Sequence, residues 1–194
     1  MASSQPPTSN SQSRTRGSIA FLLGVGIWAL GAGSYASAQI ARQEALDGVY
    51  PGAAIRAEQV FLTPQQQKQV LTQGDADVPS ALVARYIATR DGKVVGRAYV
   101  DTHTVRTKKE SLLISLDDKG QVVRIDVTAF NEPPEYRASD AWLRQYRGKS
   151  LTEDLAINRI IRPIAGATLT ARETNNAVRR VLAIDAVLES GASR

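Results

Sequence analysis

The 194-residue chain contains no cysteine. This absence excludes disulfides, thiolate zinc sites, iron–sulfur clusters, covalent c-type haem and lipid attachment through an N-terminal cysteine. Any redox chemistry in this protein therefore requires an added organic cofactor. Histidine occurs only once, at His103, and no serine-nucleophile elbow, metal-ligand cluster or P-loop is present in the sequence.

A strong excess of one charge is also missing, because the net charge is only +5. That value is too small to indicate a nucleic-acid partner. The densest basic run, residues 106–109, is followed at once by Glu110 and contains no aromatic side chain for stacking on bases. We expect this run to form a solvated turn.

Charged residues are entirely absent from residues 18–38, which follow a polar N-terminal tail at residues 1–17. The most apolar part, residues 19–30, is shorter than the ~20 residues that a membrane-spanning helix needs, although residues 31–38 can extend it. The segment is therefore either a signal peptide or a membrane anchor.

Sequence features support both alternatives. Ala36-Ser37-Ala38 has the small residues of a signal-peptidase site, whereas Trp28 and Tyr35 suit a membrane interface. In either case Arg14 and Arg16 favour the cytoplasmic side, so we expect the rest of the chain to be extracytoplasmic, in the periplasm or on the outer face of the cytoplasmic membrane.

The exported part begins with a predicted helical lead-in at residues 39–75. A short helix is expected over residues 39–47, followed by a turn at residues 50–52. Thr63 and Pro64 have the pattern of an N-cap and a first helical position, which predicts a helix through Leu71 that ends by Gly74.

Two β-hairpins are predicted next, within a domain at residues 76–189. The strands cover residues 82–89, 94–100, 112–116 and 122–130, and their turns lie at residues 91–92 and 117–120. Later elements are a Pro-rich loop at residues 131–136, a short helix at residues 139–146 and a helix at residues 171–188, before a tail at residues 190–194. The predicted fold class is α+β, a small antiparallel sheet of two hairpins packed with helices, plus an N-terminal apolar helix.

The turn before the last helix contains two threonines with different predicted roles. Thr170 and Glu173 fit a capping box, which makes Thr170 the expected helix cap. Thr168 lies on a turn of small residues, Gly166 and Ala167, that allow close approach to the backbone. A helix N-terminus favours a phosphate at this position, although the local pattern is not specific by itself.

Residues 166–170, Gly-Ala-Thr-Leu-Thr, resemble the signature of the FMN-binding domain family, which includes the covalently flavinylated subunits of the Rnf and Nqr ion-pumping complexes. The order of two hairpins, a Glu132-Pro133 loop, an aromatic helix with Trp142 and a break at residues 147–149 is also similar. The resemblance covers roughly residues 82–186.

This resemblance implies an FMN cofactor that a separate flavin transferase esterifies, through the FMN phosphate, to the threonine of the Gly-Ala-Thr core. Thr168 is the matching position. Two positions depart from the family pattern, because Arg162 replaces an acidic residue and Ala165 replaces a hydroxyl residue. The predicted cofactor-binding residues are Gly166, Ala167, Thr168, Leu169, Thr170, His103, Arg106 and Glu132.

We predict neither a catalytic residue nor a metal ligand in this sequence. The first functional interpretation is an extracytoplasmic FMN-binding electron carrier, with a flavin transferase and membrane-associated redox donor and acceptor proteins as partners. The alternatives are a component of a flavin-dependent reductase, and a flavin-free binding or assembly module of the same fold.

Overall fold

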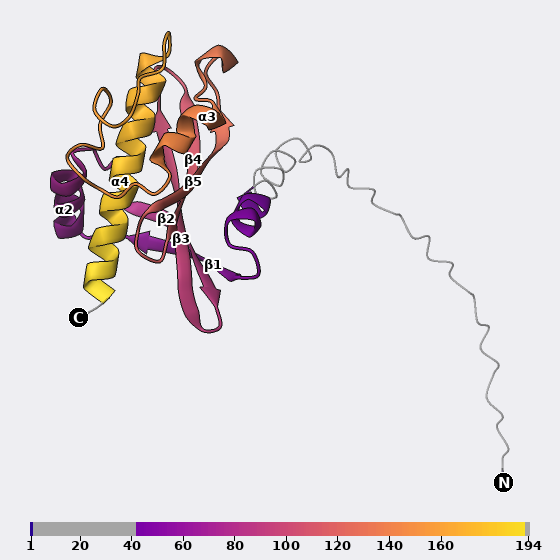
Figure 1. The fold of residues 1–194 in the computed structure, drawn as a ribbon. Helices are drawn as coiled ribbons and strands as arrows, with labels where there is room; N and C mark the ends of the chain where they lie inside the picture. Colours follow the sequence, from indigo (N-terminus) through magenta and orange to yellow (C-terminus); the bar gives the residue numbers. More distant parts are fainter. Residues whose placement is uncertain (2–41, 193–194) are drawn as a thin grey trace.

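The computed structural model describes residue 1 and residues 42–192, which form an antiparallel sheet with helices on both of its faces (Figure 1). The five strands lie in chain order, β1-β2-β3-β4-β5. Their bounds are β1 Ala54–Phe61, β2 Leu82–Arg90, β3 Lys93–Thr104, β4 Lys109–Asp117 and β5 Val122–Phe130. The α+β fold class is therefore confirmed.

Both predicted hairpins are present. Asp91 and Gly92, which connect β2 to β3, have φ angles of 51° and 73°. Positive φ at both positions matches the twist of adjacent strands and explains the Asp-Gly pair. Gly120 closes the β4–β5 turn with a φ of 78°.

The sheet has one strand more than the four that the sequence predicted. β1 lies inside residues 39–75, where only helices were expected, and pairs with β2 from Ala54↔Thr89 to Phe61↔Leu82. Its residues are mostly exposed, because β1 is an edge strand. A half-exposed edge strand carries little hydrophobic alternation, so the sequence signal for it is weak.

The predicted helix after Thr63 is confirmed as α2 (Pro64–Gly74), with a capping box between Thr63 and Gln66. Residues 42–49 are also helical, in line with the expected short helix, whose first residues lie outside the described part. The predicted helix at residues 139–146 is divided into α3 (Asp140–Leu143) and the 3₁₀ helix η2 (Arg144–Tyr146). A further 3₁₀ turn, η1 (Pro134–Tyr136), lies within the Pro-rich loop.

The last helix, α4 (Thr168–Ala192), begins three residues before the predicted start at residue 171. The predicted capping box at Thr170 is consequently wrong. Thr170 lies within the first turn, and the Glu173 carboxylate bonds to Arg172 and Asn176 instead of reaching back to the backbone. Thr170 and Ala171 are buried in the first turn of the helix, and this packing outweighed the capping pattern.

α4 packs along one face of the sheet and contributes more side chains to the main core than any other element. Its buried side chains, among them Val178 and Val181, contact Leu112, Ile114 and Tyr99 from the central strands. The helical segment 42–49 covers the opposite face, where Leu46 and Tyr50 pack on Leu113. This arrangement explains the long buried runs in β3 and β4, which are covered on both faces.

Among the described residues, no helix is long and apolar enough to cross a membrane. The apolar segment at residues 18–38, predicted to be a signal peptide or an anchor, lies outside the described residues.

Candidate functional site

The turn that precedes α4 determines where the helix begins. The Ala167 amide donates to the Ile164 carbonyl at 3.2 Å, and Gly166 has a φ of +78°, a conformation that favours glycine. The first helical hydrogen bond runs from the Ala171 amide to the Ala167 carbonyl, at 3.1 Å. The amides of Thr168, Leu169 and Thr170 therefore have no acceptor within the helix.

The two threonines of the motif differ in accessibility. Thr168, the first residue of α4, is exposed, whereas Thr170 is only 1% exposed. Only the Thr168 hydroxyl can thus be reached by another molecule. Thr170 is a packed first-turn residue instead of the predicted cap, while the role of Thr168 as attachment point stays a prediction.

A hollow of about 300 Å³ lies beside the start of α4, and we call it the Thr168 pocket. It is formed by three segments: the β3–β4 turn, the loop after β5 and the motif itself. Its lining residues are Val105, Arg106, Glu132, Tyr136, Gly166, Ala167, Thr168, Leu169 and Thr170. Seven of the eight predicted cofactor-binding residues come together here, although they are up to 64 positions apart in the sequence.

Glu132 holds the β3–β4 turn in place. One of its carboxylate oxygens, Oε1, accepts hydrogen bonds from the amides of Thr107 and Lys108, both at 2.7 Å, and from the amide of Arg106 at 3.3 Å. These backbone donors hold the pKa of Glu132 below its usual range. The structure therefore gives Glu132 a positioning role, since it fixes the backbone that carries Arg106 at the pocket.

His103, the eighth predicted residue, does not line the Thr168 pocket. Its Nδ1 bonds to Asp101 at 2.9 Å and its Nε2 bonds to Glu110 at 3.1 Å, with all three side chains buried. Burial disfavours the charged imidazolium, but the bonds to the two carboxylates outweigh that effect and raise the pKa of His103 to about 9. Arg180 of α4 completes this cluster with two hydrogen bonds to Asp101, at 2.7 and 2.9 Å.

The chemistry of the Thr168 pocket suits a molecule with both an anionic and an apolar part. The free amides of the α4 N-terminus and the Arg106 guanidinium favour a phosphate. Val105, Leu169 and Tyr136 provide apolar and aromatic surface for a planar ring. Among residues 42–192, no cluster of histidine and carboxylate side chains could hold a metal ion.

Two lining residues, Val105 and Tyr136, were not predicted from the sequence. Val105 directly precedes the predicted Arg106, and Tyr136 ends the Pro-rich loop that contains the predicted Glu132. The sequence signal for each of the two residues was therefore its position next to a predicted residue or in the same loop. The departures from the family pattern, Arg162 and Ala165, do not line the pocket. The Arg162 backbone instead bonds to Trp142 and Gln145, at 2.7 and 2.9 Å.

A five-stranded antiparallel sheet backed by a long helix, with a phosphate-compatible pocket at the start of that helix, defines a small α+β cofactor-binding domain. Residues 108–183 match the family model of the FMN-binding domain, which identifies this part of the chain as an FMN-binding domain with FMN as its cofactor. A comparison with curated proteins gives no match. The matched segment contains β4, β5 and the first part of α4, including Thr168.

Proposed function

We propose that this protein is an extracytoplasmic electron-transfer flavoprotein that carries FMN as a phosphoester on the Thr168 hydroxyl. The observation that carries this proposal is the exposure of Thr168 at the N-terminus of α4, beside free helix amides and Arg106 in one pocket. A phosphate esterified to Thr168 would lie where the helix amides can donate to it. The isoalloxazine ring would then extend over the apolar wall of the pocket.

The attachment requires a separate flavin transferase. A threonine hydroxyl is a weak nucleophile unless a neighbouring base removes its proton. His103 cannot serve, because both of its ring nitrogens are bonded to buried carboxylates. Glu132 is the only carboxylate that lines the described pocket, and its Oε1 already accepts three backbone hydrogen bonds.

The proposed role is that of a carrier, which passes electrons between membrane-associated donor and acceptor proteins. The flavin supplies the redox chemistry, while the chain supplies placement and electrostatics. The uncharged segment at residues 18–38, preceded by Arg14 and Arg16, supports an extracytoplasmic location. The pocket is lined by binding and positioning groups, which suits a carrier better than a catalyst of substrate conversion.

Intact mass spectrometry of the full chain, purified from its native host, tests the covalent attachment. We expect a mass increase of one FMN-phosphoryl group in the wild type and in Thr168→Ser, which keeps the hydroxyl. The increase should be absent from Thr168→Ala and present in Thr72→Ala, a control at an exposed threonine outside the pocket. A wild-type chain without the increase, or an increase that survives Thr168→Ala, would refute the proposed linkage.

A further inference from the structure

The outer edge of β5 is largely unpaired in the described part of the chain. β5 pairs with β4 on one side, and on the other side only Val122 makes backbone hydrogen bonds, with Gly148 at 2.7 Å and Lys149 at 2.9 Å. From residue 123 to residue 130, this edge has no backbone partner among residues 42–192. An unpaired strand edge is a template on which another extended chain can add a strand.

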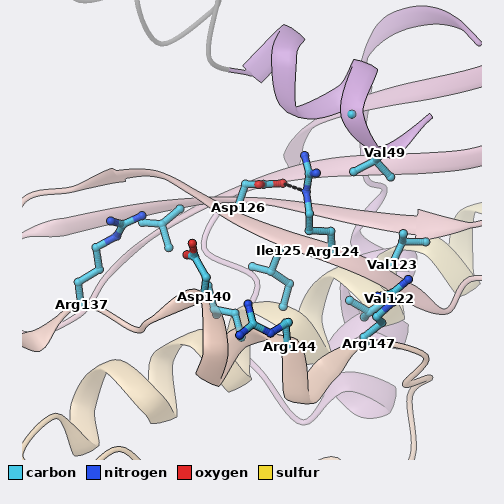
Figure 2. A pocket seen from close by; sticks show the side chains of 13 residues that line it. Val49, Val122, Val123, Arg124, Ile125, Asp126, Arg137, Asp140, Arg144 and Arg147 are labelled. Atoms are coloured by element: carbon cyan, nitrogen blue, oxygen red, sulfur yellow. Dashed lines mark hydrogen bonds and ion pairs between the residues drawn. The ribbon is translucent and has the colours of Figure 1, made fainter. Parts of the chain in front are cut away.

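A hollow of about 660 Å³ lies along this edge, and we call it the β5 groove. Its walls are the helical segment 42–49, residues 122–127 of β5 and the segment 137–147. Figure 2 shows Val49 on the first wall, Arg124 and Asp126 on the strand, and three arginines on the third wall. The groove contains none of the predicted cofactor-binding residues.

Positive charge dominates the β5 groove. Arg137, Arg144 and Arg147 line it and are exposed, and their guanidinium groups make no hydrogen bond or ion pair with the described residues. Arg124 is different, since it is paired with Asp126 at 2.8 Å and donates to the Ala45 carbonyl at 2.5 Å. Asp140 is the only other acidic residue in the lining. The groove therefore presents three guanidinium groups against one unpaired carboxylate.

Residues 2–41 and 193–194, which lie outside the described part, include no acidic residue that could pair with these arginines. A second copy paired edge to edge through β5 would bring the same arginines together, which like-charge repulsion disfavours. The charge of the groove thus points to a different, acidic chain.

We infer that the β5 groove binds an extended acidic segment of a partner protein, which adds a sixth strand to β5 and pairs its carboxylates with Arg137, Arg144 and Arg147. Backbone hydrogen bonds to the β5 edge supply affinity, and the guanidinium groups supply specificity for acidic side chains. The site adjoins the Thr168 pocket, because Tyr136 lines the pocket and the next residue, Arg137, lines the groove. A partner bound here is held beside the cofactor site, although the binding does not depend on FMN.

Fluorescence anisotropy with the full chain tests this inference, using a labelled peptide that alternates Asp and Val. We expect this peptide to bind at least tenfold more tightly than its Asn-Val counterpart at low salt. N-methylation of alternate amides on one edge of the peptide should abolish binding, whereas methylation of the opposite edge should leave it unchanged. Equal affinity for the two methylated forms, or displacement of the peptide by inorganic phosphate alone, would overturn strand addition and leave a simple anion site.

Paired arginine variants locate the binding surface. Arg144→Gln/Arg147→Gln should weaken binding of the Asp-Val peptide at least tenfold. The matched control, Arg56→Gln/Arg159→Gln, removes the same charge from exposed ion pairs outside the groove and should change the affinity less than twofold. Circular dichroism should be unchanged in both variants. Equal weakening by the two pairs would show a general charge effect and overturn the assignment to the groove.

Discussion

Glu132 illustrates how a single side chain can organise a binding site without needing to touch the ligand. Its carboxylate accepts from three consecutive amides and so fixes the turn that presents Arg106 to the Thr168 pocket. The sequence placed Glu132 at the site through the Glu-Pro loop. The tertiary structure adds the reason, because residues 106–108 and Glu132 approach one another only after β4 and β5 have paired.

We predict that Glu132→Ala loosens this turn. The amides of residues 106–108 lose their acceptor, so their hydrogen exchange should become roughly tenfold faster. Glu135→Ala, in the same loop but with an exposed side chain, should leave these rates unchanged. Hydrogen exchange measured by NMR checks the effect, and unchanged protection in Glu132→Ala would show that the carboxylate does not hold the turn.

His103 makes the stability of the fold depend on pH. Its pKa rises from 6.5 to about 9 on folding, so the folded state binds the proton more tightly than the unfolded chain does. The resulting stabilisation is complete below pH 6.5 and is lost as the pH rises to about 9. Stability is lost over this pH range because deprotonation of His103 removes the cation that Asp101 and Glu110 share.

Urea unfolding at a series of pH values tests this prediction. The free energy of unfolding of the wild type should fall between pH 6.5 and 9 by on the order of 3 kcal/mol. In His103→Gln this fall should be much smaller, while the stability at pH 6 should be lower than that of the wild type. Parallel pH profiles for the two proteins would contradict the raised pKa.

At the level of secondary-structure elements, polar contacts as well as apolar packing attach α4 to the sheet. Arg97 of β3 donates to Asp185 of α4 at 2.5 and 3.0 Å, and the Tyr99 hydroxyl donates to the same carboxylate at 2.8 Å. All three side chains are buried. A buried ion pair of this kind restricts how α4 can lie across β3, since other orientations would leave a charge unpaired.

Removal of one partner should therefore be costly. We expect Asp185→Ala to lower the free energy of unfolding by about 3–5 kcal/mol, because Arg97 and Tyr99 then lose their buried acceptor. The exposed pair between Arg159 and Asp154 provides the control, since Asp154→Ala should cost less than about 1 kcal/mol. Chemical denaturation measures both values, and similar costs would indicate that the buried pair does not hold α4.

A close approach between elements also sets the position of the helical segment on the opposite face. A Cβ atom at Gly96 would lie 2.2 Å from the Tyr50 ring and 2.6 Å from the Leu116 carbonyl. Without a side chain at Gly96, the Tyr50 hydroxyl can reach the carbonyls of Arg97 and Leu116, at 2.8 and 2.7 Å. The sequence showed a glycine within a strand, but the close approach that it permits became visible only in three dimensions.

For the molecule as a whole, residues 108–183, which match the FMN-binding domain model, are only part of the folded unit. β1 pairs with β2 along its full length, and α2 packs against α4. Leu62 and Val70 from this N-terminal part are buried in the main core. Residues 54–75 are therefore part of the same fold as residues 108–183.

A truncated chain tests whether residues 54–75 are needed for residues 108–183 to fold cooperatively. We expect residues 76–192 alone to show no cooperative thermal transition, because the loss of β1, α2 and the buried Leu62 and Val70 removes several kcal/mol from a domain stability of about 5–15 kcal/mol. Residues 42–192, which keep these elements, should unfold cooperatively. Cooperative unfolding of the shorter chain would instead support an independent domain at residues 76–189, as the sequence predicted.

Features that depend on local chemistry or on a recognisable motif could be predicted from the amino-acid sequence alone. Turn residues such as Asp91-Gly92 located the hairpins, the Thr63-Pro64 pair located α2, and the Gly-Ala-Thr motif indicated FMN. The start of α4, the edge strand β1 and the burial of His103 became visible only in the folded chain. These features depend on packing between distant segments, because burial outweighs a local cap, edge pairing needs little hydrophobic pattern, and an imidazole is protonated or neutral according to the groups that fold around it.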